Sequence, residues 1–313
     1  MKGEIVNRCP ITYELTENTY SAAGLRSLSP GLTELNIFPY SAEEQIREAA
    51  QRASKMSVQG VQPKLSAVLD IKRKIFEIVD KNGQFILKPR NYIYPELPEN
   101  EDLSMKMAKL AGIDTPVHGL IYSKDGTMTY FIKRFDRIGR NRKLPVEDFA
   151  QLTGNRRDTK YDSSMEKVAG VIDRFCTFPA VEKIKLFRLT LFNFLIGNED
   201  MHLKNFSLIT RDSKIELSPS YDLLNSSIAM EKPLEEIALP LGGKRRNLTA
   251  RLLIAYYGKE RLSLQEKVIQ NIIEKITAAF PGWMSLIDAC FLSGNMKMKY
   301  KELLKRRRDI LGI

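Results

Sequence analysis

The chain has 313 residues, of which 43% are hydrophobic and 28% are charged, the composition of an ordinary globular protein with one or two domains. No apolar run approaches the roughly 20 residues that span a bilayer, and the first residues lead into no apolar segment, so we expect neither a membrane protein nor a secreted one. The three cysteines lack metal-site spacing and suit the cytoplasm, and the net charge of +11 fits an anionic partner or simply a basic protein.

Antiparallel strands dominate the first part of the sequence after one helix. A capping box at Ser41 starts that helix, which we expect to end near Met56. Asn82-Gly83 predicts a type I′ hairpin between the second and third strands that follow. Runs of alternating apolar residues place the strands at 65–70, 73–79, 84–88, 117–122 and 128–134.

A loop, a lysine and a glutamate in this part indicate a phosphate site. The loop at 57–64 has Gly60 near its centre, and Lys88 ends the third strand, which is how kinases cradle phosphates. An exposed lysine of a β-meander also fits the pattern. A helix at 99–111 carries Glu101, which we expect to pair with Lys88; the alternative is an acidic residue that the helix dipole favours.

Helical patterns replace strands after residue 137, so we predict two domains, 1–137 and 138–313. The strand that ends at Arg134 would lead into a hinge between them. Arg306-Arg307-Arg308 would form a solvated helix face, and Gly258 would stop one helix. The helices of the second domain are predicted at 145–152, 163–175, 180–196, 247–257, 263–280, 284–291 and 295–310.

Polar side chains crowd the segment between the most apolar of these helices and a short strand. Asp200 and Asn205 have the D-x-x-x-x-N spacing of a kinase catalytic loop, in which the aspartate receives the proton of the attacking hydroxyl and the asparagine helps to hold Mg²⁺. A hairpin predicted over 206–217 leads to Asp222, which would be the second metal ligand. The spacing alone occurs by chance in many chains, and its combination with Asp222 and Lys88 favours a kinase.

Five segments in order carry a family resemblance: 57–64, 85–89, 135–137, 200–207 and 221–222. Together they resemble the HipA-like serine/threonine kinases of bacterial toxin–antitoxin systems. The short stretch before Ser57 is most similar to the HipT-type toxins of three-gene systems. The resemblance implies an α+β, bilobed, protein-kinase-like fold with a β-rich N-terminal lobe and an all-α C-terminal lobe.

The resemblance also implies roles for single residues. Asp200 would be the catalytic base, Asn205 and Asp222 would bind Mg²⁺, and Ser57 would be autophosphorylated. The residues implied to bind ATP are Val58, Gln59, Gly60, Val61, Gln62, Lys64, Lys88, Lys133, Phe135, His202, Lys204, Asn205, Tyr221 and Asp222.

The implied reaction is transfer of the ATP γ-phosphoryl to a protein serine, with an aminoacyl-tRNA synthetase as the implied target. The implied partners are a cognate antitoxin, a small separate protein that replaces a missing N-terminal subdomain, and DNA only through the antitoxin. Two other functions stay open. A catalytically inactive, DNA-associated regulator would bind DNA with an affinity that falls steeply with salt, and a small-molecule kinase would differ only in substrate.

Overall fold

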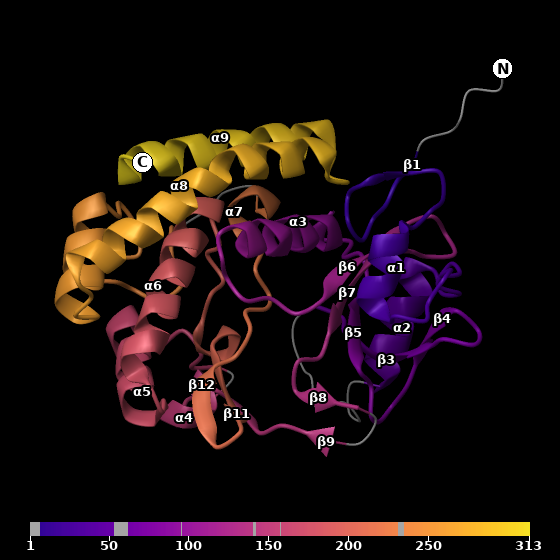
Figure 1. Cartoon of the computed structure of the whole chain (residues 1–313), viewed down its shortest axis with the longest axis horizontal. Helices are drawn as coiled ribbons and strands as arrows, with labels where there is room; N and C mark the ends of the chain where they lie inside the picture. The colour runs from indigo at the N-terminus through magenta and orange to yellow at the C-terminus, as the bar shows by residue number, and fades with distance from the viewer. Residues whose placement is uncertain (1–6, 53–61, 95, 140–141, 157, 231–234) are drawn as a thin grey trace. The chain divides into compact units, whose positions relative to one another are not determined.

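The computed structural model describes residues 7–52, 62–94, 96–139, 142–156, 158–230 and 235–313. Contacts divide the chain into two compact units (Figure 1). The first unit comprises Met1–Asp102, Pro116–Arg142 and Ala289–Leu292, and the second comprises Leu103–Thr115, Lys143–Asp288 and Ser293–Ile313. The main division therefore falls at Arg142, a few residues beyond the predicted boundary, and the segment 103–115 joins the second unit.

A five-stranded antiparallel sheet forms the centre of the first unit, in the order β4-β3-β5-β7-β6. Its core joins alternate strand residues, such as Leu65, Ala67, Phe85 and Leu87, to apolar residues of two helices, because alternation turns every second side chain to the same face. The elements of this unit are β1 (Asn7–Arg8), β2 (Leu15–Thr16), α1 (Ala22–Leu28), α2 (Ala42–Arg52), β3 (Leu65–Asp70), β4 (Ile75–Ile78), β5 (Phe85–Lys88), β6 (His118–Tyr122), β7 (Met128–Lys133) and β8 (Arg137–Ile138).

The predicted hairpin across Asn82-Gly83 is wrong, because β4 and β5 both pair with β3, on its two sides. Asn82 does turn the chain, with a φ of 58°. The chain then crosses β3 so closely that a Cβ on Gly83 would lie 1.9 Å from Oγ of Ser66. Gln84 N donates to Ala67 O at 2.9 Å on the far side of the crossing. The Asn82-Gly83 motif therefore predicts the turn correctly, but the two strands that flank this turn do not pair with each other.

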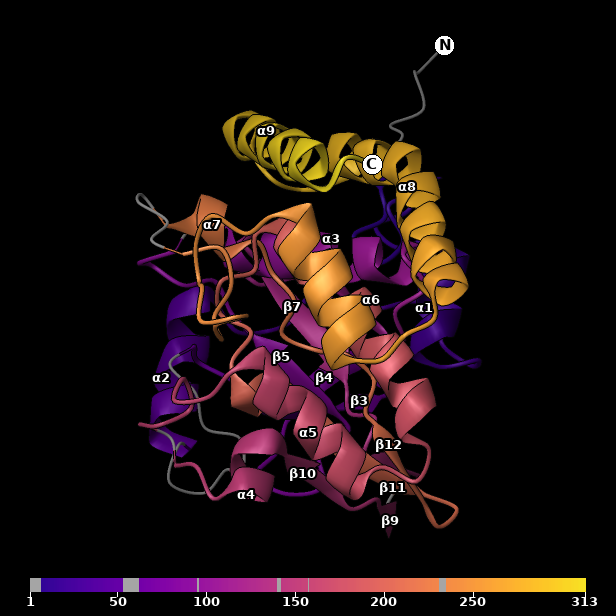
Figure 2. The ribbon, with the colours of Figure 1, turned by 90° about the vertical axis from the view of Figure 1, so that its left-hand side faces the viewer.

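The second unit is mainly helical, and Figure 2 shows several of its helices together with a small sheet. The lobe expected to be all-α therefore also holds the antiparallel strands β10-β11-β12. Helix α3 (Leu97–Leu110) starts in the first unit and ends in this one, where Trp283 Nε1 donates to Met107 O at 2.9 Å. The other elements are β9 (Arg142–Lys143), β10 (Val146–Asp148), α4 (Phe149–Thr153), α5 (Met165–Phe175), α6 (Pro179–Ile196), η1 (Leu203–Asn205), β11 (Ser207–Arg211), β12 (Lys214–Leu217), α7 (Ser226–Ala229), η2 (Arg251–Arg261), α8 (Glu266–Ala289) and α9 (Gly294–Leu311).

Four predicted helices of this unit differ in the structure, and two of them, at 263–280 and 284–291, form one helix, α8. The segment predicted as one helix at 145–152 begins as strand β10, which pairs with β11. Gly258 lies inside the π-helix η2 and does not stop it, because its missing side chain makes room for Phe187, 2.7 Å from where a Cβ would be. Helix α8 continues through Pro281, because the apolar stripe of Ile276, Phe280, Trp283 and Ile287 stays buried across it.

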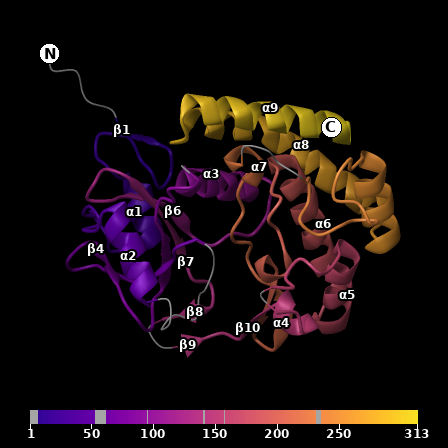
Figure 3. The same cartoon turned by 180° about the vertical axis from the view of Figure 1, so that it is seen from behind.

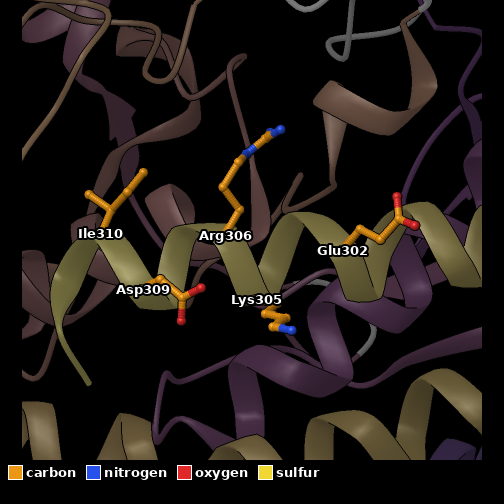
Figure 4. A pocket seen from close by; sticks show the side chains of 5 residues that line it. All are labelled: Glu302, Lys305, Arg306, Asp309 and Ile310. Atoms are coloured by element: carbon orange, nitrogen blue, oxygen red, sulfur yellow. The ribbon is translucent and has the colours of Figure 1, made fainter.

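Helix α9 contacts α6 within this unit, and Figures 1 and 3 show the two helices running in different directions. Its arginines are not one solvated face: Arg306 and Arg308 are exposed, but Arg307 is only 3% exposed and pairs with Glu236 at 2.7 Å. Figure 4 shows the exposed side of the helix, where Arg306 and Ile310 point one way and Lys305 and Asp309 the other. None of the described helices has the length and apolar character needed to cross a membrane.

Candidate active site

The predicted catalytic segment begins where α6 ends. Gly197 closes the helix with a φ of 71°, and a Cβ there would meet Ser227 Oγ at 2.8 Å and Leu303 Cδ1 at 2.9 Å, so only glycine fits. The carbonyl of Gly197 accepts from Ser227 N at 3.1 Å and lies 3.0 Å from Ser227 Oγ and 3.2 Å from Ser226 Oγ, and the Ser227 hydroxyl also contacts Glu199 Oε1. The start of the loop is therefore fixed to α7.

Asp200 lies on this loop with an accessible carboxylate. Its backbone N–H donates to Asn198 Oδ1 at 3.2 Å, and the amide of Asn198 donates in turn to Asn193 Oδ1 of α6 at 3.0 Å. The Asp200 side chain remains 48% exposed. A carboxylate held by its backbone and open to solvent can accept a proton from an incoming hydroxyl.

Asn205 and Asp222 approach the same loop. Asn205 Nδ2 donates to the carbonyl of Asp200 at 2.9 Å. The side-chain amide oxygen of Asn205 therefore points away from this carbonyl and can act as an acceptor. Asp222 follows Tyr221, whose hydroxyl lies 3.1 Å from both Lys204 O and Ser207 Oγ. Asp222 itself has a φ of 54°, an uncommon backbone conformation that is often found at functional sites.

His202 contributes a buried hydrogen-bond donor. Its Nε2 lies 2.7 Å from Lys160 Nζ, and because an ammonium group cannot accept, Nε2 accepts and the neutral ring carries its proton on Nδ1. Burial lowers the pKa of His202, and the charge of Lys160 lowers it further against the opposing effect of Asp200 and Asp222. Within the described residues the buried Nδ1 has no hydrogen-bond partner.

These groups fit a magnesium–nucleotide complex. Amide and carboxylate oxygens, from Asn205 and Asp222, are ligands that Mg²⁺ prefers, and Mg²⁺ commonly takes only one or two protein ligands beside phosphate oxygens. The unused Nδ1–H of His202 suits a phosphate oxygen, because a buried donor without an acceptor is costly.

Lys88 and Glu101 form the predicted pair in the first unit. Lys88 Nζ lies 2.5 Å from Glu101 Oε1, and the two side chains are 2% and 0% exposed. The lysine stands at the end of β5 and the glutamate in the first half of α3. The ammonium also lies 5.5 Å from the ring centre of Tyr130, on the neighbouring strand β7. Lys88 is thus not the exposed lysine of a β-meander.

The remaining predicted nucleotide residues occupy varied positions. Lys133 is exposed at the end of β7, and its N–H donates to Val117 O at 2.8 Å. Phe135 is half-buried beside Asp136, whose carboxylate is held by Arg134 at 2.9 Å. Lys204 reaches Asp148 at 3.8 Å. Their contact with a nucleotide stays a prediction.

The predicted phosphate loop lies mostly outside the described residues. This holds for Ser57, Val58, Gln59, Gly60 and Val61. Gln62 and Lys64, just before β3, are half-buried.

The structure adds one contact that the sequence analysis does not predict. The hydroxyl of Tyr161 donates to Asp200 Oδ1, and the preceding Lys160 contacts His202. No spacing or turn motif links residues 160–161 to the loop, so the sequence offered no signal for this contact.

Two solved structures share this fold. It is similar to HipA of Shewanella oneidensis, solved in complex with HipB and its operator DNA, with a TM-score of 0.69 and 23% identity over 90% of this chain and 74% of that chain. It is also similar to the proinflammatory kinase CtkA of Helicobacter pylori, with a TM-score of 0.52 and 16% identity over 72% of this chain and 86% of that one. The predicted fold, with a β-rich N-terminal part and a helical C-terminal part, is confirmed.

The family follows from the sequence. The profile of the HipA-like C-terminal domain matches residues 56–284, so the chain belongs to that family. A Haemophilus influenzae protein named "Putative kinase" is 34% identical over 224 residues, which cover 66% of this chain and 64% of the relative. The Shewanella oneidensis serine/threonine-protein kinase toxin HipA is 28% identical over 234 residues, which cover 66% and 53%. The chain thus spans about half to two thirds of the length of these relatives.

Proposed function

We propose that the chain is an ATP-dependent serine/threonine protein kinase that acts as the toxin of a bacterial toxin–antitoxin system. The observation that carries this proposal is the buried pair of Lys88 and Glu101. Burying two charges is costly unless they are paired, so such a pair in a sheet unit is weak as a stabilising device. In protein kinases a strand lysine held by a helix glutamate binds the ATP phosphates.

The residues of the second unit would supply the transfer chemistry. Asp200 would accept the proton of a serine hydroxyl and orient that hydroxyl toward the phosphoryl group. Asn205 and Asp222 would hold Mg²⁺, which when bound offsets the negative charge of the phosphates. His202 Nδ1–H would donate to an anionic oxygen of the nucleotide. Because these donors and oxygens are already fixed by the loop, little reorganisation would accompany the reaction.

The finer parts of the proposal rest on family membership. The acceptor would be a serine of a protein, with an aminoacyl-tRNA synthetase as the first candidate, and Ser57 would be phosphorylated by the chain itself. The solved complex of the Shewanella relative with HipB supports a neutralising antitoxin as partner. Membership of the short HipT-type group, with a separate small partner protein, remains a prediction.

Labelled ATP tests the proposal. The purified chain with Mg²⁺ should transfer label to itself or to proteins of a bacterial lysate, and chelation of Mg²⁺ should stop this. Asp200→Asn should lower the rate at least about 100-fold, because a general base typically contributes 10²–10⁴. Asp212→Asn is the matched control, since Asp212 lies in the exposed turn between β11 and β12. Equal rates for the two variants would refute the role of Asp200.

A further inference from the structure

Residues 160 and 161 contact the catalytic loop at three of its positions. The Tyr161 hydroxyl donates to Asp200 Oδ1. Lys160 Nζ lies 2.7 Å from His202 Nε2, and the carbonyl of Lys160 accepts from Leu203 N at 3.2 Å. The rings of Tyr161 and His202 also pack edge to face, with centroids 5.1 Å apart. A backbone contact, a charged contact and a hydroxyl contact thus bind the same two residues to one short loop.

This dipeptide is itself held from its other side. Arg245 Nη2 donates to the carbonyl of Tyr161 at 3.3 Å, and Arg245 Nη1 lies 3.3 Å from Glu235. The Lys160 ammonium lies 4.9 Å from the ring centre of Tyr161. Tyr161 is half-buried, and burial followed by the hydrogen bond to Asp200 raises the pKa of its phenol, so the hydroxyl keeps its proton and remains a donor.

We propose that Lys160 and Tyr161 are positioning residues for phosphoryl transfer. Tyr161 engages one oxygen of the Asp200 carboxylate, which leaves the other oxygen of this half-exposed group to meet the acceptor hydroxyl. Lys160 fixes the His202 tautomer that presents Nδ1–H to an anionic group. This inference rests on the proposed kinase function. It adds two residues, which lie outside every predicted motif, to those that would take part in the reaction.

The competing view is that the Tyr161 hydroxyl stands in for an acceptor and blocks the base. Two observations oppose it. Tyr161 contacts only Oδ1 of the Asp200 carboxylate. Its backbone carbonyl is held by Arg245, whereas a blocking residue would have to move away from the site. The two views predict opposite signs for loss of the hydroxyl, because removing a positioning group slows the reaction and removing a blocking group accelerates it.

The kinetic test uses Tyr161→Phe, which keeps the ring that packs on His202 and removes only the hydroxyl. The rate of label incorporation into the chain itself should fall on the order of tenfold at saturating ATP, the scale of losing a hydrogen bond that orients a reacting group. The ATP concentration at half the maximal rate and the melting temperature should not change. Tyr256→Phe is the control, since it also removes a hydroxyl that donates to a carboxylate, that of Glu166 at 3.2 Å, which is not a predicted site residue. An unchanged or higher rate for Tyr161→Phe would overturn the proposal.

The second test does not depend on activity. The chain has only two histidines, so the ring nitrogens of His202 can be assigned by nitrogen-15 NMR. The native chain should show the Nδ1–H tautomer, Lys160→Met should lose it, and the control Lys259→Met, at an exposed pair with Glu266, should keep it. An unchanged tautomer in Lys160→Met would contradict the role of Lys160. If the native chain transferred no label, the kinase proposal would fail while this measurement still decided whether Lys160 positions His202.

Discussion

The Glu99 side chain is largely buried, and this environment disfavours its charged form. Burial raises its pKa to about 7, and its Oε2 has no hydrogen-bond partner in the part of the chain that the structure describes. The ordinary pKa of such a group is near 4.5. The folded chain therefore holds this proton over a pH range in which the unfolded chain has released it.

Glu99→Gln should change how stability depends on pH. Because the folded pKa lies above the unfolded one, Glu99 costs nothing below pH 4.5, lowers the free energy of unfolding as the pH rises to about 7, and has a constant effect above that. The variant should lack this loss, so its advantage over the native chain should grow to roughly 1–3 kcal/mol between pH 4.5 and 7. Urea unfolding at several pH values between 4.5 and 7 measures the free energy of unfolding of both proteins. The control is Glu43→Gln, because the Glu43 side chain is exposed. Parallel pH curves would contradict the prediction.

At the scale of elements, the crossing at Gly83 shows how one residue sets strand order. The chain passes from β4 to β5 over the intervening strand β3, and the close approach to Ser66 leaves no room for a side chain. A longer or bulkier crossing would separate β5 from β3 and move Lys88, at the end of β5, out of register with Tyr130. The position of Lys88 therefore depends on a glycine outside every predicted site motif.

Gly83→Ala should destabilise the chain by about 2 kcal/mol or more, because the new methyl group would overlap Ser66 Oγ and crowd the backbone nitrogen of Ala67. Adding Ser66→Ala should recover part of the loss by removing the nearest atom. The control is Gly31→Ala, where a Cβ would meet nothing within 4 Å. Melting temperatures compare the variants, and equal effects of the two glycine substitutions would show that the crossing tolerates a side chain.

Local patterns accounted for much of the fold and for part of the candidate site. Strand alternation and the turn at Asp212 are local, so the strands of the first unit and the β11–β12 hairpin were predictable. The pairing of Lys88 with Glu101 was predictable because both stand at kinase-like positions. The strand order around β3 and the contact of Tyr161 with Asp200 depend on segments distant in sequence, which periodicity and spacing do not report.

At the scale of the whole molecule, the C-terminal helix is tied to the loops of its own unit by an ion pair in which the arginine is buried and the glutamate is partly exposed. Arg307 contacts Glu236 at 2.7 Å and lies 4.6 Å from the ring centre of Phe194, on the helix that precedes the candidate catalytic loop. Glu235, the neighbour of Glu236, donates its N–H to Glu199 at 3.2 Å, one residue before Asp200. The last helix of the chain thus contributes to the support of the candidate base.

Arg307→Met should lower the free energy of unfolding by about 3 kcal/mol, because it leaves the Glu236 carboxylate without its buried partner. Adding Glu236→Gln should restore part of the lost free energy of unfolding, because it removes the carboxylate charge that Arg307 no longer balances. Arg306→Met, one residue earlier on the exposed side of α9 (Figure 4), should stay within about 0.5 kcal/mol of the native chain. Urea unfolding of the four proteins gives the comparison, and similar losses at 306 and 307 would show that the ion pair has no special weight.

The contacts at the carbonyl of Gly197 link the local opening of two segments, the end of α6 and the start of α7. Because one oxygen atom accepts from Ser227 N and lies within hydrogen-bond distance of the hydroxyls of Ser226 and Ser227, the end of α6 and the start of α7 separate only when these contacts break together. Hydrogen exchange should therefore find the amides of 198–200 and 226–229 opening in one cooperative event, with a common protection factor. A nucleotide that stabilised either segment would slow exchange in the other.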